Sequence, residues 1–257
     1  MHVIDRYAYA SRIREVDPAY KVGLATVTLL LCLILNEPFV GILAIIWMFF
    51  LAVKVAGLPA DVFGRVLLAE FTFLALTTVG VALSVTAKDP TAINMWAVKL
   101  GPLWFSSSPE ALNLAFALLS RALGGTAAMN FLAMTTPLVD LLDFFRRLHI
   151  PGLLIDIMTV MYRFVFVLLE SLETMYVAQK SRLGYRSFYR GMVSAGLLAS
   201  RLFIDTYRRA QRLQTAMEAR SYDGEFRVLP TTYKQSRQLV FSGVLMVSTL
   251  LLVWGIV

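Results

Sequence analysis

The chain has 257 residues, of which 58% are hydrophobic and only 16% are charged. A soluble domain of this length could not cover so much apolar surface, so the composition indicates an integral membrane protein. The net charge of +7 is typical of cytoplasmic loops in such proteins and does not indicate nucleic-acid binding. One cysteine, Cys32, excludes an internal disulfide and a cysteine-based zinc site, and His2 and His149 are too few for a transition-metal cluster. Residues 1–20 contain no apolar run of signal-peptide type.

Apolar runs predict membrane-spanning helices at five places along the chain. All but the short first run reach the roughly 18–25 residues that are needed to cross about 30 Å of hydrocarbon. We therefore expect an all-α membrane protein with about five transmembrane helices. The runs are 21–35, 39–56, 66–87, 111–134 and 239–257.

The distribution of Lys and Arg predicts the orientation of these spans. Basic residues precede the first span and are missing from the turn at 36–38, which places the N-terminus in the cytoplasm. Residues 135–238 hold fifteen Lys and Arg, so they are expected to form a cytoplasmic domain. The predicted organisation is therefore an N-terminal segment with four spans over 1–134, the cytoplasmic domain, and a last span over 239–257 whose C-terminus is outside.

The segment 88–110, between the third and fourth spans, is expected outside the membrane. It alternates apolar and polar residues around Gly101 and Pro102. This pattern predicts a small β-hairpin over the bundle, with Trp96 and Trp104 as anchors at the membrane interface.

The run over 152–169 is apolar enough to suggest a sixth span, but its polar residues argue against one. Asp156, Arg163 and Glu170 recur every seven residues and therefore share one face of a helix. Two additional spans would also move several basic residues outside, against the charge bias. We therefore expect a long amphipathic helix at the membrane surface.

Residues 188–220 predict a second long amphipathic helix, because charged residues recur at spacings of three and four opposite an apolar face. Gly191 and Gly196 lie within this stretch and predict a break in the helix. Ahead of both long helices, the residues after Pro137 predict a short interfacial helix. The cytoplasmic part is thus expected to be a coupling domain of long amphipathic helices.

A short motif, A-x-x-small-R, closes both long helices, and its two copies lie thirty-eight residues apart. Positions i, i+3 and i+4 share a helix face, so the small residues would let a helix end enter a groove while the arginine offers a rigid donor fork. Duplication suits a partner with two-fold symmetry. The alternative is C-terminal capping, in which a basic residue meets the helix dipole and a glycine follows. The motif residues are Ala178, Ser181, Arg182, Ala216, Ala219, Arg220 and Ser221.

Two ionisable residues, Glu70 and Arg121, lie within predicted spans. Such residues are functional candidates by default, and both structural pairing and a transport pathway would explain them. Small residues beside Arg121 predict close helix packing, within the bundle or against another membrane protein. These small residues are Ala122, Gly124, Gly125, Ala127 and Ala128.

The sequence carries no signature of catalysis. It has no P-loop for ATP, no H-E-x-x-H or G-x-S-x-G motif, and no pair of acids near a predicted membrane face. We therefore expect a protein that is not an enzyme and that holds neither a metal nor a cofactor of its own.

The sequence resembles the EcfT family, the transmembrane T components of energy-coupling factor transporters. The resemblance rests on D-P-x-x-K from Asp17 to Lys21, on the T-T-P…R-R-L-x-x-P stretch over 135–151, and on the two arginine helix ends. The start of the chain looks most like the cobalt-uptake branch, CbiQ. The first motif departs from the usual Ala-Arg-Gly, because Leu183 stands ahead of Gly184.

The resemblance implies a bundle of about five helices and a coupling domain docked on a dimer of ABC ATPase subunits, which bind ATP and Mg. It also implies a separate membrane S component that holds the substrate, with or without a small accessory membrane subunit. The expected location is the bacterial inner membrane, with lipid around the bundle and no nucleic-acid partner.

The resulting hypothesis is a non-catalytic transmembrane coupling component that transmits ATPase closure to the substrate-binding subunit during cobalt uptake. The same sequence features would be compatible with nickel or a vitamin as the transported substrate. One alternative is a stand-alone secondary transporter or channel for a small ion, which would need midplane polar residues and an inverted repeat of spans. A membrane-embedded enzyme would need a cluster of acids or histidines at one depth.

Overall fold

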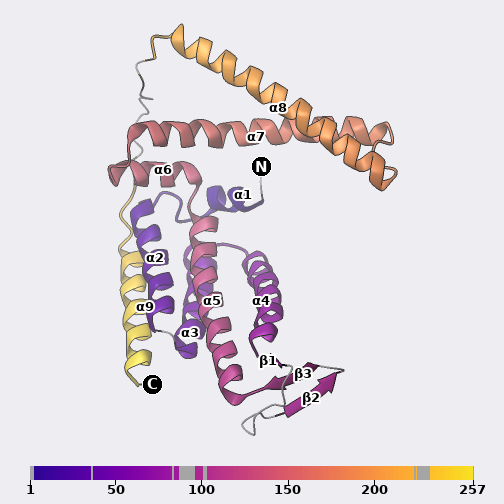
Figure 1. Ribbon diagram of the computed structural model, residues 1–257. Coiled ribbons are helices and arrows are strands. Elements are labelled where there is room, and N and C mark those ends of the chain that lie inside the picture. Colours follow the sequence, from indigo (N-terminus) through magenta and orange to yellow (C-terminus); the bar gives the residue numbers. More distant parts are fainter. Residues whose placement is uncertain are drawn as a thin grey trace. The chain divides into compact units, whose positions relative to one another are not determined.

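The computed structural model describes residues 3–35, 37–82, 84–86, 96–100, 103–222, 224 and 232–256. This part of the chain is mainly helical, with a small sheet between two of the helices (Figure 1). The elements in chain order are α1 (Val3–Ala10), α2 (Pro18–Leu35), α3 (Pro38–Phe50), the π-helical η1 (Leu51–Val55), α4 (Ala60–Ala82), β1 (Ser84–Thr86), β2 (Trp96–Leu100), β3 (Leu103–Ser107), α5 (Pro109–Thr135), α6 (Leu138–Arg147), α7 (Gly152–Ser181), α8 (Phe188–Glu218) and α9 (Arg237–Ile256).

The expected class, an all-α membrane protein, is confirmed. Within the described ranges, six helical stretches are long and apolar enough to cross a membrane. Five of them are α2, α3 with η1, α4, α5 and α9, which correspond to the five predicted runs. The sixth is α7, which the sequence assigns to the membrane surface because of its polar stripe. That assignment of α7 stays a prediction.

The third predicted run, 66–87, begins and ends several residues after the helix that the structure shows. The helix α4 spans Ala60–Ala82, and Ser84–Thr86 form the strand β1 instead. Pro59 and Asp61 give an early start signal that the apolar pattern alone does not contain. After Ala82 the β-branched residues of S-V-T favour an extended strand.

The helices form two compact units. One comprises Leu138–Thr231 and the other comprises His2–Pro137 with Thr232–Val257. We call the first the arm unit and the second the bundle unit. The sequence-based domains, 1–134, 135–238 and 239–257, describe positions relative to a membrane and stay a prediction.

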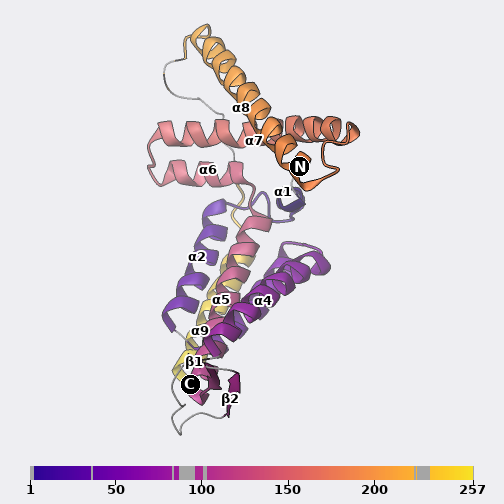
Figure 2. The ribbon, with the colours of Figure 1, turned by 45° about the vertical axis from the view of Figure 1, so that its right-hand side comes forward.

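The arm unit contains α6, α7 and α8. The helix α6 lies beside the first part of α7, and α8 crosses α7 and then diverges from it (Figures 1 and 2). The predicted break at Gly191 and Gly196 is wrong, because α8 runs unbroken over 31 residues. The Ser187 side chain caps its start by accepting the amide of Arg190. Each glycine costs only about 1 kcal/mol relative to alanine, which the continuous hydrogen bonds of a long helix can offset.

The predicted hairpin is present, and its place outside the membrane stays a prediction. Strands β2 and β3 pair antiparallel, with Leu100 opposite Leu103, and β1 adds to the other edge of β3. The predicted turn residues Gly101 and Pro102 and the side chains of Trp96 and Trp104 lie outside the described part, so their role as interface anchors stays a prediction. The sheet joins α4 to α5.

The small residues predicted to mediate helix packing lie inside the bundle unit. Ala127 and Ala128 of α5 are fully buried, and Gly41 of α3 lies against the α5 backbone. A methyl group built on Gly41 would clash with the Ser120 carbonyl oxygen. The helices α3 and α5 therefore approach as closely as small residues allow. A methyl group on Gly125 would meet nothing within 4 Å.

Gly41→Ala is expected to destabilise the bundle by about 1–3 kcal/mol, because the new methyl group must push the α5 backbone away. Gly125→Ala is the matched control and should be neutral or slightly stabilising, since alanine favours the helix. Thermal unfolding in detergent measures both. Equal melting temperatures for the two variants would contradict this close approach of α3 and α5.

Lys21 is buried in the bundle unit, although lysine almost never is. Its Nζ donates to the Ile13 carbonyl oxygen at 3.0 Å and to the Thr135 carbonyl oxygen at 3.3 Å. Thr135 is the last residue of α5, so the ammonium also meets the negative end of that helix dipole. Lys21 thereby ties α2, the segment before it and the end of α5 together.

Candidate functional site

The first arginine motif lies at the C-terminal end of α7, where the sequence predicts a helix end. Arg182 follows the last helical residue, and Leu183 takes the left-handed conformation with φ of 58°. The Leu183 amide donates to the Lys180 carbonyl at 3.0 Å, and the Gly184 amide donates to the Gln179 carbonyl at 3.0 Å. These bonds form a Schellman motif, which satisfies carbonyls that the helix end leaves open.

The end of α8 repeats this geometry position by position. Ser221 takes the left-handed conformation with φ of 53°. Its amide donates to the Glu218 carbonyl at 3.1 Å, and the Tyr222 amide donates to the Met217 carbonyl at 3.1 Å. Arg220 therefore has the same place in its helix end as the arginine of α7. The two motifs are duplicates in structure as well as in sequence.

The capping interpretation expects a glycine at the left-handed position, and this detail is wrong at both ends. The left-handed residues are Leu183 and Ser221, even though Gly184 follows directly. A non-glycine residue in this conformation costs roughly 1–2 kcal/mol. The helix α6 ends in the same conformation at His149, with φ of 59°. The left-handed helix end is therefore not specific to α7 and α8. The feature that distinguishes these two ends from the end of α6 is the arginine directly before the left-handed residue.

Leu183→Gly is expected to stabilise the arm unit by about 1 kcal/mol, because glycine adopts the left-handed conformation without strain. Leu183 is 60% exposed, so little packing is lost. Leu197→Gly is the matched control, since Leu197 is 59% exposed but lies inside α8; it should destabilise by about 1 kcal/mol. Both effects can be measured by thermal unfolding of the purified protein. A lower melting temperature for Leu183→Gly than for wild type would be the contrary result.

The motif side chains are available to a partner. All seven candidates are exposed: Ala178, Ser181, Arg182, Ala216, Ala219, Arg220 and Ser221. Neither arginine side chain forms an ion pair or hydrogen bond with the residues that the structure describes. The helix α8 lies between the two arginines, and its 31 residues put them about 45 Å apart along its axis.

Polar contacts lock the corner between α7 and α8 next to Arg182. The Gln179 side-chain amide donates to the Ser194 carbonyl at 3.1 Å, and the Tyr185 hydroxyl donates to Gln179 Oε1 at 2.8 Å. The Ser194 hydroxyl in turn donates to the Gly184 carbonyl at 2.9 Å. A methyl group on Gly184 would lie 2.7 Å from Ser194 Oγ and 3.0 Å from the Gln179 carbonyl oxygen, so a side chain there would displace the Ser194 hydroxyl. The corner is therefore a rigid support for the Arg182 end.

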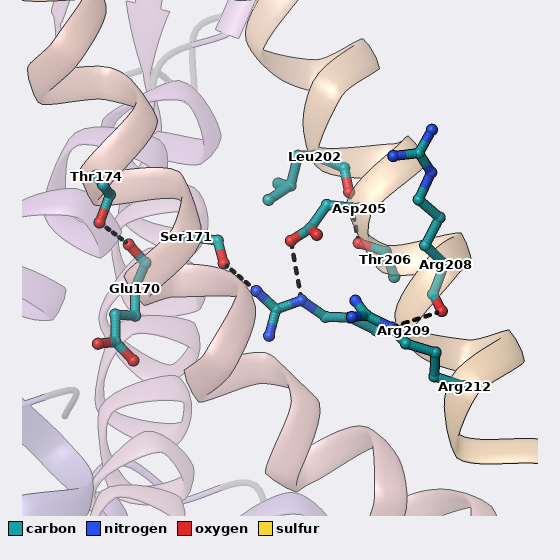
Figure 3. A network of polar contacts seen from close by, with 9 residues as sticks. All are labelled: Glu170, Ser171, Thr174, Leu202, Asp205, Thr206, Arg208, Arg209 and Arg212. Carbon is teal, nitrogen blue, oxygen red and sulfur yellow. Dashed lines mark hydrogen bonds and ion pairs between the residues drawn. The ribbon is translucent and has the colours of Figure 1, made fainter. Parts of the chain in front are cut away.

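Arg220 lies instead on a cleft of the arm unit with a volume of about 690 Å³. Three further arginines line this cleft, Arg163 of α7 and Arg209 and Arg212 of α8. Arg209 spans the gap between the helices, since its Nε donates to Asp205 at 2.9 Å and its Nη2 donates to Ser171 at 3.0 Å (Figure 3). The polar stripe predicted for α7 thus faces α8 at Arg163.

The charges predicted within the spans are not isolated. The Asn130 side-chain amide of α5 donates to both carboxylate oxygens of Glu70 on α4 at 2.8 Å. Arg121 is half-buried and also has an interaction partner. Among the described residues, no group of three or more His, Cys, Asp or Glu could hold a metal ion.

Sequence reasoning missed the arginine cleft and the α7–α8 corner. Arg209 and Arg212 belong to the charged face that is predicted for the helix over 188–220, and no sequence pattern marks Gln179. The three-residue spacing of Arg209 and Arg212 is a signal for a basic face, but the approach of Arg163 and Arg220 depends on how α8 crosses α7.

Comparison with known proteins supports one family. The model of the CbiQ family, described as cobalt transport protein, matches residues 10–231, which include both arginine motifs. An uncharacterized protein of Methanocaldococcus jannaschii is 32% identical over 231 residues, covering 90% of this chain and 84% of that protein. The cobalt transport protein CbiQ of Rhodobacter capsulatus is 35% identical over 186 residues, covering 70% and 76%. The energy-coupling factor transporter transmembrane protein EcfT of Staphylococcus aureus is 31% identical over 133 residues, covering 45% and 46%.

Proposed function

Because this chain belongs to the CbiQ family of cobalt transport proteins, we propose that it is the non-catalytic coupling component of an ATP-driven cobalt importer. It is a multi-pass membrane component of a cobalt or energy-coupling factor transporter. In the proposal, an ABC ATPase dimer binds the arm unit from the cytoplasm, and a separate membrane subunit holds the ion. ATP and Mg bind to the ATPases.

The observation that carries this proposal is the duplicated helix end. Arg182 and Arg220 occupy equivalent positions, are exposed, and flank a helix about 45 Å long. A symmetric dimer offers two equivalent sites, so each subunit would receive one helix end. A guanidinium fork suits carboxylates at the bottom of a groove, because it binds them with two parallel hydrogen bonds.

The same geometry suggests how movement would be transmitted. When the ATPases close on ATP, the two helix ends must follow their subunits. The contacts among Gln179, Tyr185 and Ser194 hold α7 and α8 together at one corner. A displacement at Arg182 therefore moves both helices instead of bending one of them. The arm unit would pass this motion to the membrane part and from there to the substrate-binding subunit.

Affinity isolation in a mild detergent tests the proposal. The chain should bring down ABC ATPase subunits and a second membrane protein that binds cobalt, each identified by mass spectrometry. The alternative of a stand-alone transporter or channel expects the chain alone. Isolation of the chain without any ATPase, under conditions that keep other ABC transporters intact, would refute the proposal.

The proposed orientation places the arm unit in the cytoplasm and the sheet outside. A membrane-impermeant maleimide should label Arg186→Cys and Glu110→Cys from opposite sides of the membrane, since both residues are exposed. The native Cys32 is buried and provides the unlabelled control. Labelling of both introduced cysteines from the same side would contradict the orientation.

A further inference from the structure

The cleft beside Arg220 combines positive charge with apolar walls. Arg163, Arg212 and Arg220 are exposed along it, and Arg209 lies deeper between the helices. Apart from Thr159, the rest of the lining consists of aliphatic and aromatic residues of α6, α7 and α8, including Val160, Phe164 and Leu213. Its volume of about 690 Å³ is in the range of ligand-binding clefts.

Within the part of the chain that the structure describes, the positive charge of the cleft is largely uncompensated. No Asp or Glu is among the described residues that line it. Asp205 pairs with Arg209 from outside the cleft (Figure 3), while Arg163 and Arg220 form no ion pair within the described ranges. Gathering like charges is unfavourable without a partner, so this arrangement favours an anionic occupant.

The end at Arg182 is chemically different. Its neighbours include large apolar side chains that are unusually exposed, with Phe188 at 88%, Tyr189 at 79% and Met192 at 63%. Exposed aromatic residues of this kind are typical of apolar protein contacts. The two helix ends thus share an arginine and a backbone geometry, but one offers an apolar surface and the other a basic cleft.

The faces of α7 indicate from which side the occupant comes. Exposed apolar residues form a stripe at helical spacing over Leu153, Ile157, Met161 and Val165. At 100° per residue, Met161 and Val165 lie about 160° around α7 from the cleft residue Arg163, whereas Leu153 lies only about 80° from it. The part of the stripe at Met161 and Val165 is therefore turned away from the cleft, so lipid or apolar protein can cover that face while the cleft receives a ligand from water.

We propose that the cleft lined by Arg163, Arg209, Arg212 and Arg220 binds an acidic segment of the cytosolic ATPase partner. This inference rests on the proposed function and adds that, around the arginine contact that both helix ends share, the two ends make different further contacts. Guanidinium groups around an apolar wall fit a segment with several carboxylates and a few aliphatic side chains. Binding at the Arg220 end should therefore depend strongly on salt, whereas binding at the Arg182 end should depend on it weakly.

Charge-removing variants test the cleft directly. Arg163→Gln and Arg212→Gln should each weaken the binding of the purified ATPases about tenfold, and the double variant about a hundredfold with a reduced dependence on salt. Neither side chain pairs with an acid among the described residues, so folding should be retained. Arg201→Gln is the control, because Arg201 is exposed on α8 but does not line the cleft; it should change binding less than twofold.

Crosslinking identifies the occupant. A photoreactive amino acid in place of Leu213 should attach to an ATPase segment that contains several Asp or Glu residues. Attachment to a segment without acids would overturn the inference, as would wild-type affinity in the Arg163→Gln/Arg212→Gln variant. Native mass spectrometry with phosphatidylglycerol tests the other anionic source: lipid lost from the double variant while ATPase binding stays unchanged would make the cleft a lipid site.

The outcomes separate this inference from the proposed function. If wild-type protein binds no ATPase at all, the proposed function itself is wrong. If binding needs Arg182 and Arg220 but not Arg163 and Arg212, the proposed function stands and the cleft is not the acidic-segment site.

Discussion

Arg182→Glu and Arg220→Glu are each expected to weaken ATPase binding severely while the protein still folds and inserts. Alanine at either position should cost about 2–5 kcal/mol of binding free energy, because it leaves a desolvated acid on the partner unpaired. Glutamate adds like-charge repulsion and should cost more. The double variant should lose the complex outright, since a single intact end can still tether the dimer through avidity.

The structure makes these variants informative, because neither arginine side chain supports the described part of the arm unit. If the arginines only cap their helices, each change costs about 0.3–1 kcal/mol of stability and assembly survives. Arg201→Glu provides the control for the change of charge on an exposed α8 position. Co-purification of the ATPases, quantified for both single variants and the double variant, distinguishes the two accounts. Recovery of the ATPases at wild-type levels with the double variant would reduce both motifs to helix ends.

Lys21→Met is expected to destabilise the bundle unit strongly. The substitution keeps an unbranched side chain of similar length but removes the donor to the Ile13 and Thr135 carbonyls. Each buried acceptor left without a donor costs about 1–3 kcal/mol, so the total should be roughly 3–5 kcal/mol. For a protein of this size, that corresponds to a fall in melting temperature of about 6–20 °C.

Lys54→Met is the matched control, because it removes the same charge from an exposed position in η1. Its melting temperature in detergent should lie within about 2 °C of wild type, as expected for a surface substitution. A Lys21→Met protein with a wild-type melting temperature would show that the ammonium does not hold the helix ends together.

Most of the helical fold follows from local sequence signals. The fourth predicted run, 111–134, differs from α5 by only two residues at one end and one at the other, because Ser108 and Pro109 mark its start. The errors arose where a single residue was given more weight than the helix around it, or where the residue's surroundings come from distant parts of the chain. Gly196 does not break α8, and the buried lysine of α2 could not be recognised without the chain segments that surround it.

The candidate site, like the fold, could be predicted from the sequence only in part. The positions of Arg182 and Arg220 at helix ends depend on short-range pattern and were predictable. The cleft was not, because Arg163 and Arg212 are 49 residues apart in the sequence and meet only where α8 crosses α7. The chemical difference between the two helix ends likewise becomes visible only with side-chain exposure.

ATP-driven uptake of radiolabelled cobalt into liposomes tests the central claim most directly. Liposomes that contain this chain, its ATPases and the substrate-binding membrane subunit should accumulate cobalt only with ATP. Omission of any one of these components, or use of the Arg182→Glu/Arg220→Glu variant, should abolish accumulation. Cobalt movement through liposomes that contain this chain alone, at the rate of the complete complex and without ATP, would contradict the account.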